Sequence, residues 1–160
     1  MAGWEEIAMR KVSTADGKST YIANPDFVND NFQVYVWNNV WGGGNEDLSY
    51  RLANAGYPVV ICSSANFYFD LAYDWDPDER GHTWSGVSDM YQSWKTVPGK
   101  LYLSHDQTIE GDTWDWTEAE KRFTQLTDQG KRNILGVSGQ LWTETVKSPE
   151  MLEYYLLPKM

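Results

Sequence analysis

The sequence has one cysteine, Cys62, and two histidines, His82 and His105, among its 160 residues. A single cysteine forms no intrachain disulfide and no cysteine zinc cluster. Neither histidine stands at a metal-ligand spacing from a cysteine, aspartate or glutamate. We therefore expect no metal site, and no sequence motif points to another cofactor.

Basic residues are also few, because 13 Lys and Arg stand against 23 Asp and Glu, for a formal net charge of −10. Nucleic acid and anionic lipid surfaces both attract basic proteins. No apolar run reaches the ~18 residues of a membrane span. The first residues, MAGWEEIAMRK, lack the apolar stretch of a secretory signal. We expect neither nucleic acid nor a membrane as a partner.

Aromatic residues, in contrast, are abundant, with nine Trp, ten Tyr and five Phe. Some of these rings belong in a core, but so many are also typical of a surface that binds flat apolar faces. The remaining composition, 41% hydrophobic and 22% charged, is that of a globular protein. The length fits one domain over residues 1–160.

The hydrophobic pattern predicts alternating strands and helices. Apolar and β-branched segments predict strands at 33–37, 58–62 and 134–137. Capping residues and apolar periodicity predict helices that start at Asn45, Ser88, Thr117 and Ser148, the third ending at Gly130. Residues 15–30 and 63–86 are predicted loops. This order is typical of an α/β fold with a parallel sheet.

Aromatic and acidic residues follow the three predicted strands. Trp37 ends the first, Tyr68 and Asp70 follow the second, and Trp142 and Glu144 follow the third. In parallel α/β folds the functional groups lie at the carboxyl ends of strands. Aromatic rings with carboxylates between them suit a sugar, whose C–H faces stack on the rings while its hydroxyls donate to the acids. Any one of these Trp residues could equally pack in the hydrophobic core.

Several segments resemble a known enzyme family. Residues 134–144, ILGVSGQLWTE, closely resemble the last barrel strand of glycoside hydrolase family 20, the β-N-acetylhexosaminidases. Other segments match the family in the same order along the chain. Gly3-Trp4-Glu5-Glu6-Ile7 is similar to the family's Gly-Trp-Asp-Glu-Ile at the end of strand five, and Val36-Trp37-Asn38, with Gly42-Gly43 following, is similar to strand six. Residues 59–70 resemble strand seven with its Tyr-Leu-Asp, residues 81–86 resemble the Trp-containing loop that follows, and residues 148–160 resemble the last helix.

The resemblance implies the fold and the size of the parent protein. The chain would be the carboxyl-terminal part, about strands 6–8, of a TIM (β/α)8 barrel. A full barrel needs ~250 residues, so 1–160 would be a partial domain truncated at both ends. The parent would hydrolyse terminal β-linked N-acetylhexosamine from glycans, and the family resemblance places it in the periplasm or outside the cell.

The resemblance also implies a pocket for the 2-acetamido group of the sugar. Trp4, Trp37 and Trp142 would line this pocket. Tyr68 would donate its hydroxyl to the acetamido oxygen. In this family that oxygen is the nucleophile, so the mechanism is substrate-assisted and retaining.

Other matched residues would bind the outer part of the sugar. Asp70 and Glu144 would accept hydrogen bonds from the hydroxyls, and Trp84 would close the pocket near the 6-hydroxyl. Four tryptophans have no match in the family, and we expect core or rim packing for them: Trp75, Trp94, Trp114 and Trp116.

One departure from the family concerns catalysis. Its catalytic pair is an adjacent Asp-Glu after strand four, and the sequence has no matching segment. Asp78-Glu79 and the reversed Glu46-Asp47 are adjacent acids, but we interpret them as a solvated loop and a helix start. Glu5 and Glu6 follow a strand without matching the general acid. The family's sugar-binding arginine from strand one is also missing, so we expect the isolated chain to be inactive.

Two alternatives remain open from the sequence. The same rings and acids would serve a non-catalytic carbohydrate-binding module, or a Trp-rich interface without sugar affinity. An Asp-Glu pair after Gly-Gly upstream of Met1 would distinguish the enzyme from the module. The sequence does not choose between N-acetylglucosamine and N-acetylgalactosamine. Open sheet edges predict self-association of the isolated chain, while in the parent the rest of the barrel would be its partner.

Overall fold

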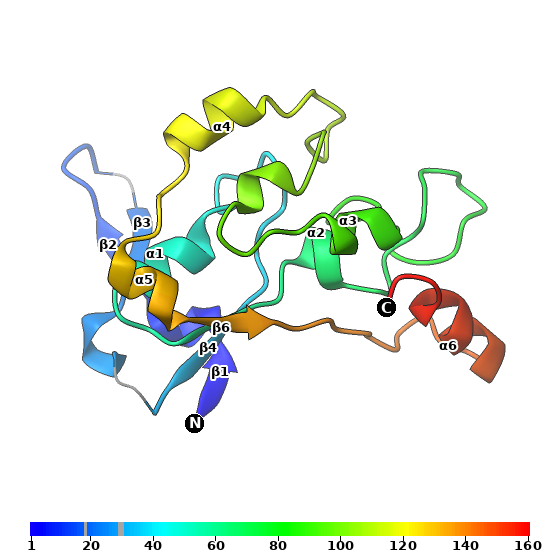
Figure 1. Ribbon diagram of the computed structural model, residues 1–160, viewed down its shortest axis with the longest axis horizontal. Helices are drawn as coiled ribbons and strands as arrows, with labels where there is room; N and C mark the ends of the chain where they lie inside the picture. Colours follow the sequence, from blue (N-terminus) through cyan, green and yellow to red (C-terminus); the bar gives the residue numbers. More distant parts are fainter. Residues whose placement is uncertain (18, 29–30) are drawn as a thin grey trace.

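The computed structural model describes residues 1–17, 19–28 and 31–160. Its centre is a four-stranded parallel sheet in the order β1-β4-β5-β6 (Figure 1). The strands are β1 (Ala2–Trp4), β4 (Gln33–Val36), β5 (Val59–Ile61) and β6 (Ile134–Val137). The three predicted strands are thus confirmed, and β1 adds a fourth. All four carboxyl ends meet at one edge of the sheet.

One face of the sheet carries the core. Helix α1 (Leu48–Asn54) packs against β5 and against α5 (Asp128–Asn133). Leu52 of α1 is fully buried with Val59 and Ile61 of β5. Successive strand residues point to opposite faces, so Val60 lies on the other side, where it is only partly buried. The continuous apolar run at residues 58–62 is therefore fully buried on one face of the sheet and only partly buried on the other.

A two-stranded antiparallel hairpin follows β1. Its strands are β2 (Met9–Ser13) and β3 (Ser19–Ala23), and the short 3-10 helices η1 (Glu5–Ala8) and η2 (Pro25–Phe27) flank it. The loop predicted over 15–30 is therefore wrong for β3 and η2, while its residues 18, 29 and 30 lie outside the described residues. The polar composition of this stretch did not indicate a strand, because β3 is stabilised by its pairing with β2.

Helix boundaries differ from the predictions where a different residue caps the helix. α4 (Trp116–Arg122) begins after Asp115, whose carboxylate accepts from the backbone N–H groups of Thr117 and Glu118. Thr117 is therefore not the cap. The helix predicted to run to Gly130 ends at Arg122, and a second helix, α5, starts after its own cap, Thr127.

Gly130 does not end a helix but lies inside α5. A Cβ atom there would come within 2.0 Å of the Asn54 side chain, so glycine allows α5 to approach α1 closely. The first predicted helix begins at Leu48 rather than at Asn45. Asn45 instead accepts a hydrogen bond from Arg51 at 3.0 Å.

Four further elements complete the described part of the chain. They are α2 (Ser64–Phe67), α3 (Met90–Trp94), η3 (Leu101–Leu103) and α6 (Pro149–Leu156). Helix α2 packs against α3, and η3 packs against α4. Asp89 caps α3 with a capping box and Ser148 caps α6, so the last helix begins as predicted. α6 lies at the opposite end of the molecule from the β2–β3 hairpin (Figure 1).

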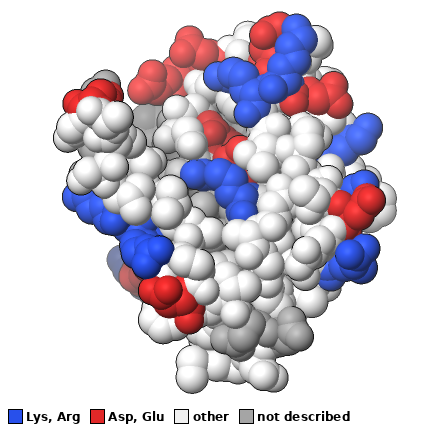
Figure 2. Space-filling view, turned by 90° about the vertical axis from the view of Figure 1, so that its left-hand side faces the viewer, with Lys and Arg blue, Asp and Glu red and all other residues white. Residues whose placement is uncertain are grey.

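The surface charge is mixed on the face that carries the hairpin. Basic and acidic side chains alternate there around an uncharged area, so the net negative charge is not concentrated on this face (Figure 2). Within the described part of the chain, none of the helices combines the length and the apolar character needed to cross a bilayer.

The sheet edges lead to a prediction about assembly. β6 forms one edge, and its Leu135 and Val137 side chains are 51% and 47% exposed. Such an apolar edge offers unpaired backbone groups to a second sheet. We expect the purified chain to be dimeric or larger by size-exclusion chromatography with light scattering. Leu135→Lys, which places a charge on this edge, should shift it toward monomer. A monomer of the unaltered chain at high concentration would contradict the prediction.

Candidate active site

A cavity of about 640 Å³ opens at the carboxyl edge of the parallel sheet. Trp4 ends β1, Trp37 follows β4, Tyr68 follows β5 and α2, and Trp142 follows β6. The structure brings together all seven residues that the sequence nominated and adds Glu6 and His82. The complete lining is Trp4, Glu6, Trp37, Tyr68, Asp70, His82, Trp84, Trp142 and Glu144.

Backbone pairing beyond the strands joins the two halves of the cavity. Past the ends of β5 and β6, Tyr68 forms a parallel bridge with Gln140. The N–H of Phe69 donates to the carbonyl of Gln140 at 2.8 Å, and the N–H of Gln140 donates to that of Phe67 at 2.8 Å. A Cβ atom on Gly139 would lie 2.4 Å from the Phe69 ring, so glycine permits this approach. Tyr68 and Trp142 are thereby held side by side.

Five aromatic rings form a continuous arc around the cavity. The ring centroids are 6.0 Å apart for Trp4 and Trp142, 5.8 Å for Trp142 and Tyr68, 5.9 Å for Tyr68 and Trp84, and 5.9 Å for Trp84 and Trp37. Three of these contacts are edge-to-face. Trp84, Trp142 and Trp4 are 45%, 38% and 37% exposed, whereas Tyr68 is 5% exposed. The arc therefore presents apolar ring surface to solvent around a buried phenol.

Two buried polar groups lie within this arc. Burial raises the pKa of the Tyr68 hydroxyl, so the phenol stays protonated and remains a donor. The Asp70 carboxylate accepts from the N–H of Trp142 at 3.2 Å, while burial raises its pKa. The site thus offers a hydroxyl donor beside a carboxylate acceptor, and Glu144 adds an exposed carboxylate at the rim.

Glu5 and Glu6 both hold Trp37. The buried carboxylate of Glu5 accepts from the N–H of Trp37 at 2.5 Å and from that of Asn38 at 3.3 Å. Glu6 accepts from the indole N–H of Trp37 at 3.1 Å. Burial raises the pKa of Glu5 to about 7, although the two backbone donors favour its charged form. These acids fix one wall of the cavity.

The sequence pointed only indirectly to Glu6 and His82 as cavity residues. Each lies two positions from a nominated tryptophan, Glu6 after Trp4 and His82 before Trp84. That proximity was the available signal.

The other adjacent acids lie outside the cavity lining and have partners elsewhere. Glu79 accepts from the Tyr154 hydroxyl at 2.6 Å. Glu46 accepts from the N–H of Gly42 at 2.7 Å, and Asp47 pairs with Arg51 at 3.0 Å. Asp78 is exposed. These contacts agree with the interpretation of Asp78-Glu79 as part of a loop and of Glu46-Asp47 as part of a helix start.

His105 is buried away from this cavity, 3.2 Å from the carbonyl of Ala65, and burial lowers its pKa to about 4. A search of residues 1–17, 19–28 and 31–160 reveals no cluster of three or more His, Cys, Asp or Glu side chains placed to hold a metal ion.

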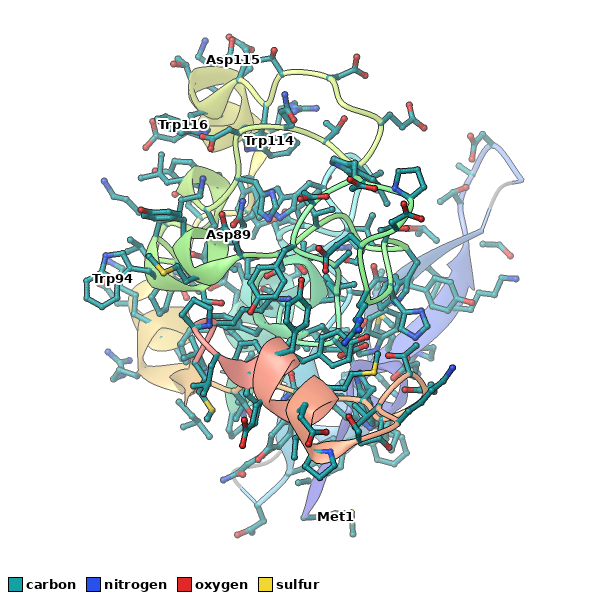
Figure 3. All side chains as sticks on the ribbon, turned by 90° about the vertical axis from the view of Figure 1, so that its right-hand side faces the viewer. Met1, Asp89, Trp94, Trp114, Asp115 and Trp116 are labelled. Atoms are coloured by element: carbon teal, nitrogen blue, oxygen red, sulfur yellow. The ribbon has the colours of Figure 1, made fainter. Side chains whose placement is uncertain are left out.

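Of the four unmatched tryptophans, one is in the core. Trp114 is 9% exposed and packs edge-on against Trp41 at 5.0 Å. Trp116, at the start of α4, and Trp75 are 45% and 55% exposed. Trp94 is 87% exposed and projects from the end of α3 (Figure 3), so the expectation of core or rim packing is wrong for Trp94.

Comparison with known proteins identifies the family. The model of the glycosyl hydrolase family 20 catalytic domain matches residues 1–160. A β-hexosaminidase of Vibrio vulnificus is 31% identical over 129 residues, which cover 80% of this chain and 14% of that protein. The N,N′-diacetylchitobiase of Vibrio harveyi is 27% identical over 135 residues, covering 84% of this chain and 14% of that protein.

Solved structures show the same fold. The family 20 exo-β-N-acetylglucosaminidase of Vibrio harveyi, in complex with N-acetylglucosamine, superposes with a TM-score of 0.60 at 19% identity, covering 99% of this chain and 18% of that one. A mutant β-hexosaminidase of Streptomyces plicatus, in complex with its product, gives 0.58 at 20% identity, with coverages of 99% and 24%.

The chain belongs to glycosyl hydrolase family 20, as the resemblance predicted, and its parallel sheet is part of that family's TIM barrel. It spans only 14% of the length of the curated relatives described above.

The buried Glu5 leads to a prediction about stability. Its pKa is about 7 in the folded chain against an ordinary 4.5, so the folded state binds this proton more tightly than the unfolded chain does. The contribution is complete below about pH 4.5, and it is lost as pH rises to about 7. Glu5→Gln should remove a pH-dependent difference of about 3 kcal/mol in the free energy of unfolding across this range.

Urea unfolding followed by tryptophan fluorescence, repeated across this pH range, measures the difference. Glu153→Gln, at an exposed glutamate of α6, is the matched control and should keep the pH dependence of the unaltered chain. An identical pH dependence in Glu5→Gln and in the unaltered chain would show that Glu5 does not titrate in this way.

Proposed function

We propose that this chain forms the sugar-binding part of a β-N-acetylhexosaminidase that removes terminal β-linked N-acetylhexosamine from glycans. The arc of four tryptophan rings around the buried phenol of Tyr68, with the buried Asp70 carboxylate beside it, is the observation that carries the proposal. Rings of this kind stack on the apolar faces of a sugar, and the polar groups between them bind its hydroxyls. Membership of family 20 and the β-hexosaminidase relatives support the same activity.

The reaction in this proposal is substrate-assisted. Trp4, Trp37 and Trp142 form the walls around the 2-acetamido group. The acetamido oxygen attacks the anomeric carbon from within the substrate as the glycosidic bond breaks and the leaving oxygen takes a proton from the general acid. Water then attacks the same carbon and opens the ring that has formed, so two inversions retain the configuration. The protonated hydroxyl of Tyr68 donates to that oxygen and orients it for attack. Holding the acetamido oxygen in line with the anomeric carbon lowers the barrier by orientation, because the attack then needs little further rearrangement.

The carboxylates of the cavity bind the outer hydroxyls of the sugar. Asp70, fixed by the N–H of Trp142, accepts from one hydroxyl, and Glu144 at the rim accepts from another. Trp84 packs on Tyr68 and Trp37 and closes the cavity on the side of the 6-hydroxyl. Each of these groups binds the substrate without taking part in bond cleavage.

The proton donor of the reaction lies outside this chain in our proposal. Residues 1–160 are then a partial domain, and the rest of the barrel supplies the adjacent Asp-Glu pair. The acids that line the cavity are Glu6, Asp70 and Glu144, and none of them is adjacent in sequence to another. This separation also favours the alternative of a carbohydrate-binding module, which an upstream Asp-Glu after Gly-Gly would exclude.

The isolated chain should be catalytically inactive. General acid catalysis contributes typically 10²–10⁴-fold, and the positioning supplied by the rest of the barrel is missing as well. We expect no detectable release of nitrophenol from nitrophenyl N-acetyl-β-glucosaminide by the purified chain. Turnover that disappears on changing Glu5, Glu6 or Glu79 would contradict this and would identify a different catalytic acid.

In the complete protein, Tyr68→Phe should lower kcat by about 10²–10³, because the acetamido oxygen is then no longer held in line with the anomeric carbon. The phenyl ring keeps its packing against Trp84 and Trp142. The interaction strengthens mainly in the transition state, so kcat changes more than KM. Steady-state kinetics on a 2-acetamido substrate measures this. Tyr91→Phe, at a tyrosine that is 61% exposed, is the matched control. A kcat within about threefold of the parent would place Tyr68 away from the acetamido group.

Asp70→Asn should behave differently in the same assay. Asp70 holds a hydroxyl in both the ground state and the transition state, so part of the loss should be a raised KM. A charged hydrogen bond of this kind is worth roughly 1.5–3 kcal/mol. An unchanged KM would argue against contact between Asp70 and the substrate.

A further inference from the structure

Lys159 is a buried lysine directly behind the cavity. It follows α6, and its side chain is 3% exposed, whereas lysines are rarely buried without partners. The Lys159 ammonium donates to the carbonyl of Phe69 at 3.1 Å and to that of Leu71. It also lies 3.9 Å from the centre of the Tyr73 ring. All of these partners are main-chain carbonyls or a ring, and none is a carboxylate.

The segment whose carbonyls bind the Lys159 ammonium, residues 69–71, contains Asp70. The Asp70 carbonyl accepts from the N–H of His82 at 2.9 Å, and the N–H of Ala72 donates to the carbonyl of His82 at 2.8 Å. A Cβ atom on Gly81 would lie 2.7 Å from the Asp70 carbonyl, so no larger residue fits between these strands of chain. The carbonyls of residues 69, 70 and 71 thus all have partners, and Lys159 supplies two of them.

Tyr73 ties the same segment to α6. Its hydroxyl donates to the carbonyls of Tyr154 and Leu157 at 2.8 and 2.9 Å. The Tyr73 ring also packs on Tyr154 with 5.2 Å between centroids. The carboxyl end of α6 therefore holds residues 69–73 through Lys159 and Tyr73 together. In Figure 3, α6 lies in front of the rest of the molecule, on the side that faces the viewer.

We propose that Lys159 is a positioning residue of the sugar site, which fixes the backbone on both sides of Asp70 and thereby the direction of the Asp70 carboxylate. This inference rests on the proposed function, because the carboxylate it positions is the one assigned to a sugar hydroxyl. Asp70 has its own backbone bond to Trp142, and Lys159 secures the opposite side of the residue. Without the ammonium, two buried carbonyls lose their donors, and the segment relaxes until they find others.

The electrostatic setting agrees with this placement. Burial lowers the pKa of Lys159 to about 8, while the carboxylates of Asp70, Glu79 and Asp89 favour its charged form. Tyr73 contributes the face of its ring, which also favours a cation. The ammonium has three N–H groups and points at two carbonyls and one ring, so each donor has a partner.

The test compares Lys159→Met with Lys159→Arg in the complete protein that contains this chain. Methionine keeps the length of the side chain but has no donor, whereas arginine keeps charge and donors. Lys131→Met, at a lysine whose side chain is 64% exposed, is the matched control. Steady-state kinetics on nitrophenyl N-acetyl-β-glucosaminide and hydrogen exchange of the amides of residues 69–72 are the two measurements.

Lys159→Met should raise KM about tenfold with a smaller change in kcat, because a displaced carboxylate weakens substrate binding in every bound state. Exchange should accelerate about tenfold in residues 69–72 and stay unchanged in β4 and β5. Lys159→Arg and Lys131→Met should keep the KM and the exchange rate of residues 69–72 within about threefold of the values for the unaltered protein. Lys159→Gln, which retains one amide donor group, should give an intermediate KM and serves if the Met variant does not fold.

The outcomes separate this inference from the proposed function. If the unaltered protein releases no nitrophenol, the proposed function fails, and exchange in residues 69–72 still decides whether Lys159 holds the segment. If the protein is active and Lys159→Met has an unchanged KM, or if exchange rises equally throughout the chain, the positioning role is overturned. An unchanged exchange rate in residues 69–72 overturns it as well.

Discussion

The cavity depends on parallel pairing that continues beyond the strands. β5 and β6 end at Ile61 and Val137, yet the chain that follows them still pairs through Tyr68 and Gln140. This pairing places the buried phenol beside Trp142 although 73 residues lie between them in the sequence. The ring arc and the contact between Asp70 and Trp142 follow from the same register. A slip of one residue would reverse the side on which each ring points.

Two buried ionisable side chains then secure the loops on either side of this pairing, and they bond to opposite kinds of backbone group. Glu5 gathers N–H groups at Trp37 and Asn38, and Lys159 gathers carbonyls at Phe69 and Leu71. Each side chain bonds to two main-chain groups instead of forming an ion pair. A buried ion pair would tie together only two side chains, whereas these groups fix two loop backbones that carry cavity residues.

The sequence predicted the sheet and the cavity lining better than it predicted the helices. Short apolar runs located β4, β5 and β6, and family motifs nominated the seven cavity residues. Helix starts failed at Thr117 because Asp115 is an equally good cap two residues earlier. β3 was not predicted because it is stabilised by pairing with β2, which its own polar sequence does not show. The burial of Lys159 was not predicted because nothing in the local sequence distinguishes a buried lysine from an exposed one. These failures share a cause, since tertiary contacts decided between locally equivalent choices.

The long stretch of chain between Ala72 and Asn133 starts near the cavity and returns to the sheet at the opposite edge, where Asn133 directly precedes β6. Leu101, Tyr102 and Trp114 of this stretch belong to the core, so only its exposed turns tolerate insertions at little cost, because closing a longer loop adds only ~0.6 kcal/mol per doubling of its length. Insertions near the exposed Trp75 or Trp94, which both lie outside the cavity lining, leave the pairing of β5 with β6 unchanged. The outer surface of this stretch can therefore vary in length, while Trp84, which lies in the same stretch, is held at the cavity by its contacts with Tyr68 and Trp37.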